Sequence, residues 1–151
     1  METQIMDGRM VSDLVIQSVK SKVESYRESS TEPKLAIILV GDNPSSKSYV
    51  KQKEKACHTA GLTYEQINYP DSVSEDEILS KIHELNTDMN IHGILVQLPL
   101  PAHVNVPKIL KAISPRKDVD GFHAYNIGKM LLDKDFELLS PCTPKGVIKI
   151  L

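Results

Sequence analysis

A regular alternation of short apolar segments with longer amphipathic segments constrains the fold of this chain more than any other feature. The apolar segments LAIILV and HGILVQL, with the weaker YEQINY between them, occupy residues 35–40, 92–98 and 64–69, and amphipathic segments occupy residues 11–26, 45–60 and 75–85. Short apolar runs bounded by turn residues predict strands, whereas apolar residues at three- and four-residue steps predict helices. Alternating strands and helices are typical of βαβ units. We therefore predict an α/β fold, a three-layer αβα domain with a mostly parallel sheet.

The last third of the chain has a weaker pattern. Residues 107–113 and 124–132 are predicted to form short helices. In SPCTPKGVIKIL, Thr143 is placed as an N-cap and Pro144 at the first helical position, so a further helix should begin there. The sequence stops at Leu151 inside this helix, which leads us to expect that the chain is part of a longer protein.

Composition narrows the class of protein. The length of 151 residues suits one domain, and 18 Lys and Arg against 20 Asp and Glu give a formal net charge of −2. A chain this close to neutrality exerts no general attraction on phosphate backbones or anionic membranes, so neither nucleic acid nor a membrane is expected as a partner. No apolar run approaches the roughly 20 residues of a membrane helix, and the N-terminal residues lack the features of a signal or transit peptide. These properties predict a soluble, cytoplasmic protein.

The cysteines and histidines do not predict a metal site. Cys57 and Cys142 lie far apart and suggest neither a disulfide framework nor a zinc cluster, and the five histidines show no metal-ligand spacing. Cys57 is expected to pack in the core, whereas Cys142 lies in a loop and could line a site. None of the seven glycines completes a GxGxxG motif or a P-loop.

A lysine on an apolar helix face is the first candidate for chemistry. On a helical wheel of residues 45–60, Lys53 is the one charged member of an otherwise apolar face, and Tyr49 lies one turn before it. Partly desolvated surroundings favour a neutral lysine amine, which can act as a base or a nucleophile. The alternative is that Lys53 extends from the edge of the core to solvent and that Tyr49 only packs.

Polar side chains at the end of one strand and in one turn are the next candidates. Gln97 interrupts the apolar run GILVQLPLP, at the end of a predicted parallel strand, where α/β proteins bind ligands. It could orient a ligand or a water, or it could cap backbone groups left unpaired by the prolines that follow. Asp118 and Asp120 in KDVDGF could form a solvated turn, or a carboxylate held in a pocket could accept paired hydrogen bonds from an amino-heterocycle.

Four motifs together resemble one known family. The segments VGDNPSSKSYVKQKEKAC, HGILVQLPLP, SPRKDVDGFHAYNIGKM and PCTPKG occupy residues 40–57, 92–101, 114–130 and 141–146. In this order and spacing they resemble the N-terminal catalytic domain of the bifunctional methylenetetrahydrofolate dehydrogenase/methenyltetrahydrofolate cyclohydrolase family. The resemblance implies that residues 1–151 form the folate-binding catalytic domain. It also implies that an NADP- or NAD-binding Rossmann domain follows in the full-length protein and is absent from this chain.

The resemblance also implies roles for individual residues. Lys53 is similar to the catalytic lysine of the family's YxxxK motif, Tyr49 to the tyrosine that stacks on the folate, and Gln97 to the glutamine that supports the lysine. Asp120 resembles the aspartate that binds the pterin ring, and Ser46 a serine that helps to hold the lysine. The implied substrate-binding set also contains neighbours of these residues in the chain: Val50, Lys51, Gln52, Val96 and Leu98. Two further residues, Cys142 and Thr143, are implied to lie near the cofactor.

The function implied by the resemblance is one-carbon interconversion on tetrahydrofolate. The full-length enzyme would oxidise 5,10-methylenetetrahydrofolate with NADP or NAD and hydrolyse the 5,10-methenyl product to 10-formyltetrahydrofolate, as part of one-carbon metabolism and purine biosynthesis. It would be a cytoplasmic homodimer. The alternatives are an isolated cyclohydrolase domain, a non-catalytic folate-binding fragment, and an enzyme in which Lys53 forms a Schiff base with a carbonyl substrate.

Overall fold

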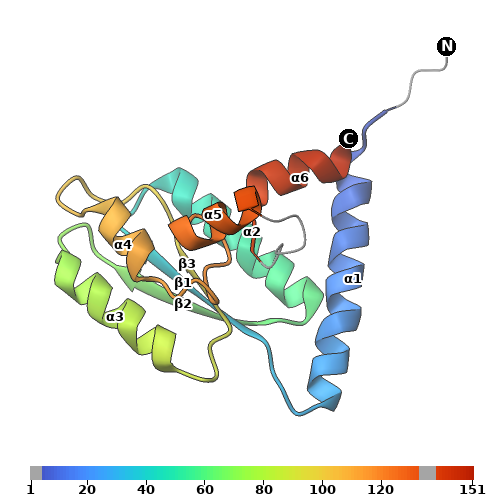
Figure 1. Cartoon of the computed structure of the whole chain (residues 1–151), viewed down its shortest axis with the longest axis horizontal. Coiled ribbons are helices and arrows are strands. Elements are labelled where there is room, and N and C mark those ends of the chain that lie inside the picture. The colour runs from blue at the N-terminus through green and yellow to red at the C-terminus, as the bar shows by residue number, and fades with distance from the viewer. Residues whose placement is uncertain (1–4, 133–138) are drawn as a thin grey trace.

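The computed structural model describes residues 5–132 and 139–151, and these residues form an α/β domain (Figure 1). In chain order the elements are α1 (Gly8–Glu28), β1 (Lys34–Val40), α2 (Pro44–Ala60), β2 (Thr63–Tyr69), α3 (Glu75–Thr87), β3 (Gly93–Val96), α4 (Val106–Ala112), α5 (Ala124–Leu132) and α6 (Cys142–Ile150). Every helix and strand expected from the sequence is present, with boundaries shifted by a few residues.

The sheet is parallel and has β1 at its centre. Its order is β2-β1-β3, so the central Ile38 pairs with Ile67 on one side and with Val96 on the other. A parallel sheet of this kind needs both faces covered, which explains why β1 is apolar throughout its buried part. The predicted α/β class is confirmed, and the strands that the structure describes are all parallel.

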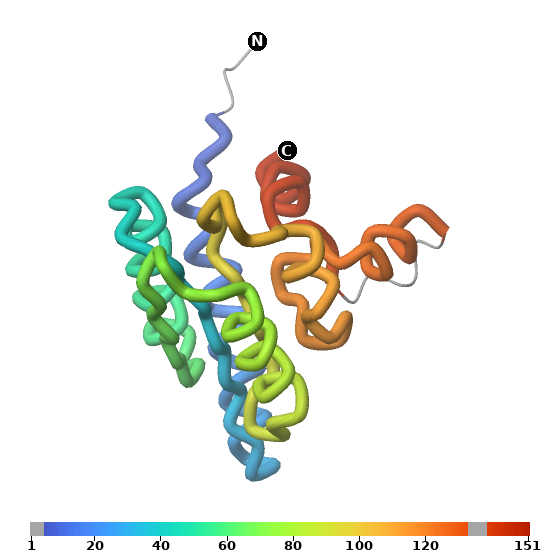
Figure 2. The backbone as a smooth tube through the Cα atoms, turned by 90° about the vertical axis from the view of Figure 1, so that its left-hand side faces the viewer, coloured from blue at the N-terminus to red at the C-terminus, as the bar shows by residue number. Residues whose placement is uncertain are grey.

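Alternate side chains of β1 pack into two separate layers. Ile37 and Leu39 lie in one apolar cluster with Val50 of α2. Ile38 points to the other face of the sheet and lies in a second cluster with Ile78 of α3 and with residues of α4. Figure 2 shows α2 and α3 on opposite sides of the sheet. This arrangement confirms the predicted three-layer organisation.

Local signals fix both ends of α2, the helix that carries Lys53. The Asn43 side chain accepts hydrogen bonds from the N–H groups of Ser45 and Ser46, at 2.9 and 3.1 Å, and Pro44 occupies the first turn. The helix ends at Gly61, whose φ of 77° is left-handed and suits glycine. The position of Lys53 along the helix is therefore set by residues on both sides of it.

Two predicted boundaries differ from the structure. The strand expected over residues 92–98 ends at Val96, although the Gln97 N–H still donates to the Ile38 carbonyl at 2.9 Å. The expectation that Thr143 caps the last helix is wrong, because α6 begins at Cys142 and has Pro141 at its N-cap position, with no side-chain cap. The thiol of Cys142 donates to the Val119 carbonyl at 3.2 Å, which ties this helix end to a distant loop in place of a local cap.

The described residues contain neither a candidate membrane span nor a candidate metal-binding cluster. None of the helices within residues 5–132 and 139–151 has the length and apolar character needed to cross a membrane. Nor does this part of the chain bring three His, Cys, Asp or Glu side chains into a group that could hold a metal ion.

Candidate active site

Lys53 and Gln97 meet at the carboxyl end of the sheet, although 44 residues separate them. The Lys53 Nζ atom donates a hydrogen bond of 3.0 Å to Gln97 Oε1. Gln97 Nε2 in turn donates to the Leu98 carbonyl at 2.7 Å, which fixes the orientation of the amide so that its oxygen faces the lysine. The glutamine thus holds the amine in one place.

Two residues of α2 complete this part of the site. Ser46 is buried, and its hydroxyl donates to the same Leu98 carbonyl at 3.5 Å, so Ser46 and Gln97 converge on one backbone atom. Tyr49 lies one turn before Lys53 and remains 59% exposed. An exposed aromatic ring beside a lysine and an amide offers a flat apolar surface on which a heterocycle can stack.

The loop that contains Asp118 and Asp120 lies beside β3. Asp118 forms a parallel bridge with Ile94, and the Ile94 N–H donates to the Lys117 carbonyl at 2.7 Å. The structure separates the two carboxylates, because Asp118 is 2% exposed whereas Asp120 is half-buried. Asp118 is therefore a structural anchor, and Asp120 is the carboxylate that remains partly accessible.

Gly121 brings the start of α6 onto this loop. Its φ is 71°, and a Cβ at this position would lie 2.5 Å from the carbonyl carbon of Ser140 and 2.7 Å from the nitrogen of Pro141. Only glycine permits both the left-handed conformation and such a close approach of two backbones. The approach places Cys142, with its sulfur turned toward the Val119 carbonyl, next to Asp120.

Charge interactions connect Lys53, Asp120 and Cys142. Burial raises the pKa of Asp120 above its usual value, the charge of Lys53 opposes this shift, and the charge of Asp118 adds to it. Burial also raises the pKa of Cys142, and the Asp120 charge adds to the effect. A thiol with a raised pKa stays protonated at neutral pH and is a poor nucleophile.

The other residues expected at the site lie in different environments. Val50 and Val96 are 2% and 3% exposed, with their side chains in the two apolar clusters of the core, so they support the site from below and do not form its surface. Their place in the substrate-binding set stays a prediction. Leu98 is half-buried at the end of β3, whereas Lys51, Gln52 and Thr143 are exposed.

Sequence reasoning missed a buried network behind Asp120. The Asp118 Oδ2 atom accepts hydrogen bonds from the His123 N–H at 2.8 Å and from Asn126 Nδ2 at 2.9 Å. Asn126, on α5, is itself 6% exposed. The sequence contains only a weak signal for this contact, namely a polar residue one turn into a short apolar helix.

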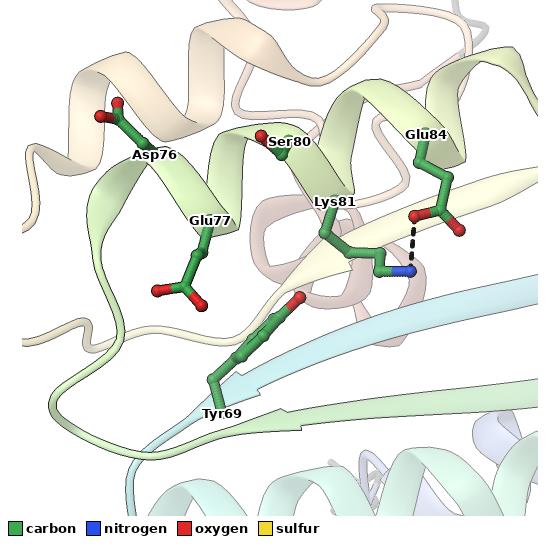
Figure 3. A pocket seen from close by; sticks show the side chains of 6 residues that line it. All are labelled: Tyr69, Asp76, Glu77, Ser80, Lys81 and Glu84. Carbon is green, nitrogen blue, oxygen red and sulfur yellow. Dashed lines mark hydrogen bonds and ion pairs between the residues drawn. The ribbon is translucent and has the colours of Figure 1, made fainter.

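A surface hollow of about 330 Å³ lies elsewhere, between β2 and α3 (Figure 3). Tyr69 lies at its base, and its other lining residues come from α3: Asp76, Glu77, Ser80, Lys81 and Glu84. Lys81 is paired with Glu84 at 2.6 Å within this lining. The hollow contains none of the candidate site residues, because α3 and α2 cover opposite faces of the sheet.

The fold and the site define a class of protein. It is an α/β domain in which a lysine, an amide and a carboxylate are grouped at the carboxyl end of a parallel sheet, the edge at which α/β enzymes commonly bind small molecules. Residues 6–120 match the family model of the tetrahydrofolate dehydrogenase/cyclohydrolase catalytic domain. The chain belongs to this family.

Individual relatives agree with this assignment. The chain is 48% identical over 147 residues to the bifunctional protein FolD of Oceanobacillus iheyensis, a match that covers 97% of this chain and 51% of the relative. Its fold matches the bifunctional FolD enzyme of Campylobacter jejuni with a TM-score of 0.93 at 42% identity, covering 98% of this chain and 52% of the other. It also matches the Trypanosoma brucei enzyme, solved with NADP cofactor and inhibitor, with a TM-score of 0.92 at 29% identity, covering 100% and 52%. The chain thus spans about half the length of the curated relatives it matches.

Proposed function

We propose that this chain forms the folate site and supplies the catalytic lysine of a methylenetetrahydrofolate dehydrogenase/methenyltetrahydrofolate cyclohydrolase. The observation that carries the proposal is the hydrogen bond of 3.0 Å between Lys53 Nζ and Gln97 Oε1. It unites two motifs far apart in sequence into one catalytic arrangement. The bifunctional names of the FolD relatives support the two reactions.

The hydrolytic reaction suits a neutral amine. Methenyltetrahydrofolate carries a delocalised cationic amidinium, beside which a neutral amine is better tolerated than an ammonium ion. With one N–H directed at Gln97, a neutral Lys53 amine retains its lone pair to accept a proton from water. The water oxygen bonds to the methenyl carbon, the bond from that carbon to N5 then breaks, and 10-formyltetrahydrofolate and one proton result.

Binding requires a fixed pterin beside this amine. In this proposal the Tyr49 ring stacks on the folate and the Asp120 carboxylate accepts hydrogen bonds from the pterin ring; the exposure of the ring and the partial accessibility of the carboxylate support these roles. Leu98 would contact the ligand from the end of β3, with Lys51 and Gln52 at the outer rim. Because both reactants are already held in place on binding, less entropy is lost in reaching the transition state.

The start of α2 does not fit the diphosphate of a dinucleotide. In Rossmann folds the diphosphate lies on the N–H groups at the start of the first crossover helix. Here the corresponding N–H groups of α2 are bonded to the Asn43 side chain, and Pro44 follows it. We therefore place NADP, or NAD, mainly on the half of the protein that this chain does not span, with Cys142 and Thr143 at its near edge.

The wider setting is part of the same proposal. Residues 1–151 would act as the catalytic domain beside a dinucleotide-binding domain, in a cytoplasmic homodimer that serves one-carbon metabolism and purine biosynthesis. The TM-score of 0.92 to an enzyme crystallised with NADP supports the use of that cofactor by the complete protein.

The decisive experiment follows the absorbance decay of methenyltetrahydrofolate with the purified chain and no dinucleotide. Lys53→Met should remove hydrolysis above the buffer rate, a loss of about 10²- to 10⁴-fold for a general base. Lys55→Met is the matched control, because Lys55 is exposed on the same helix. Equal decay with wild type and Lys53→Met would refute the catalytic role. If the wild type neither hydrolyses this substrate nor binds tetrahydrofolate in calorimetry, the proposed function itself is refuted.

A further inference from the structure

The loop that carries Asp120 is held by a carboxylate that does not reach the surface. Asp118 is 2% exposed, and its Oδ2 atom accepts hydrogen bonds from the His123 N–H at 2.8 Å and from Asn126 Nδ2 at 2.9 Å. The second N–H of the Asn126 amide is used as well, because Nδ2 also donates to the Pro115 carbonyl at 2.9 Å. One carboxylate oxygen thus joins the middle of the loop to its end and to the start of α5, and the Asn126 amide adds a bond to the beginning of the loop.

The backbone of Asp118 makes further contacts on the sheet side. Its N–H donates to the Ser114 carbonyl at 3.0 Å, its carbonyl accepts from the Gly121 N–H at 3.3 Å, and the residue bridges Ile94 of β3. Within the described part of the chain, the groups on Oδ2 are an N–H and an amide and not a cation. Without this acceptor the His123 N–H and the Asn126 amide would each lose a buried partner, so the position of the loop depends on it.

We propose that Asp118 is a positioning residue for the folate site, which holds Asp120 and Cys142 in place beside Lys53 through its buried contacts with His123 and Asn126. The folate part of this inference rests on the proposed function, whereas the placement of the loop does not. Asp118 touches no ligand-accessible surface, so its effect on binding must pass through the loop. Its negative charge also contributes to the raised pKa of Asp120.

The first test measures loop placement without folate. Cys142 is exposed, but its thiol donates to the Val119 carbonyl, so release of the loop should free the thiol from this bond and make it more reactive, whereas Cys57 is buried and serves as an internal reference. Asp118→Ala should accelerate alkylation of Cys142 by iodoacetamide in the native chain by about tenfold, the effect of losing a buried hydrogen-bond acceptor. Asp118→Asn keeps an oxygen that can accept both bonds and should label like the wild type.

The second test measures tetrahydrofolate affinity by calorimetry, with Ile82→Val as a control that weakens the core on the α3 side without touching the loop. Asp118→Ala should weaken binding about tenfold, Asp118→Asn should restore it, and Ile82→Val should leave it unchanged. If Asp118→Ala does not fold, Asn126→Ala removes one donor and should change both measurements in the same direction. The proposal is overturned if these variants label and bind no differently from Ile82→Val. If the wild type does not bind tetrahydrofolate, the proposed function fails and the alkylation rates still decide whether Asp118 positions the loop.

Discussion

Replacing Gly121 with alanine tests how strongly the fold depends on the close approach between the backbone at Gly121 and the backbone just before α6. The left-handed φ of 71° costs a non-glycine residue about 1–2 kcal/mol. The added Cβ would lie 2.5 Å from the Ser140 carbonyl carbon, and relieving such a contact costs about 1–3 kcal/mol more. Because the loop is bonded to β3, we expect Gly121→Ala to lower the free energy of unfolding by about 2–5 kcal/mol, the sum of these two costs.

The measurement is denaturant unfolding, and the chain offers a matched control. A Cβ at Gly128, inside α5, would meet nothing within 4 Å, so Gly128→Ala should stabilise the protein by about 0.5–1 kcal/mol. The reasoning would be refuted if Gly121→Ala unfolded within about 0.5 kcal/mol of the wild type, the usual range for an inconsequential surface change. It would also be refuted if both glycine variants lost stability equally.

Two further predictions concern a helix cap and a titrating carboxyl. Asn43→Ala removes the side-chain cap of α2 and should lower the free energy of unfolding by about 0.5–2 kcal/mol in denaturant unfolding; no change would show that the cap is dispensable. Because the pKa of Asp120 is raised in the folded protein, folding favours the protonated form of this carboxyl. The stability that this preference gives is fully present below the pKa that Asp120 has in the unfolded chain, and it is lost as pH rises through the pKa that Asp120 has in the folded protein. Asp120→Asn should therefore stabilise the fold at a pH of about 7 but not at about 3, while weakening tetrahydrofolate binding. An equal effect at both pH values would contradict this assignment.

Local pattern was enough to predict the elements that support the site. The apolar period of α2 placed Lys53 on the same face as Val50, and the structure confirms that this face meets the sheet. The glycine and asparagine that end and begin this helix act over a few residues, so the chain specifies them without help from distant segments. Gln97 could also be selected as a candidate from local sequence alone, because it is a polar residue that interrupts an apolar run.

The sequence by itself determined the α/β class, the parallel strands and the helix faces, since these depend on spacing between neighbours in the chain. Only the tertiary structure decided which candidate residues meet. It joined Lys53 to Gln97 across 44 residues. It buried Asp118 while leaving Asp120 accessible, although the two carboxylates stand two positions apart in one motif. Such differences arise from contacts with β3, α5 and α6, and the periodicity of a short segment contains no information about elements that pack against it from elsewhere.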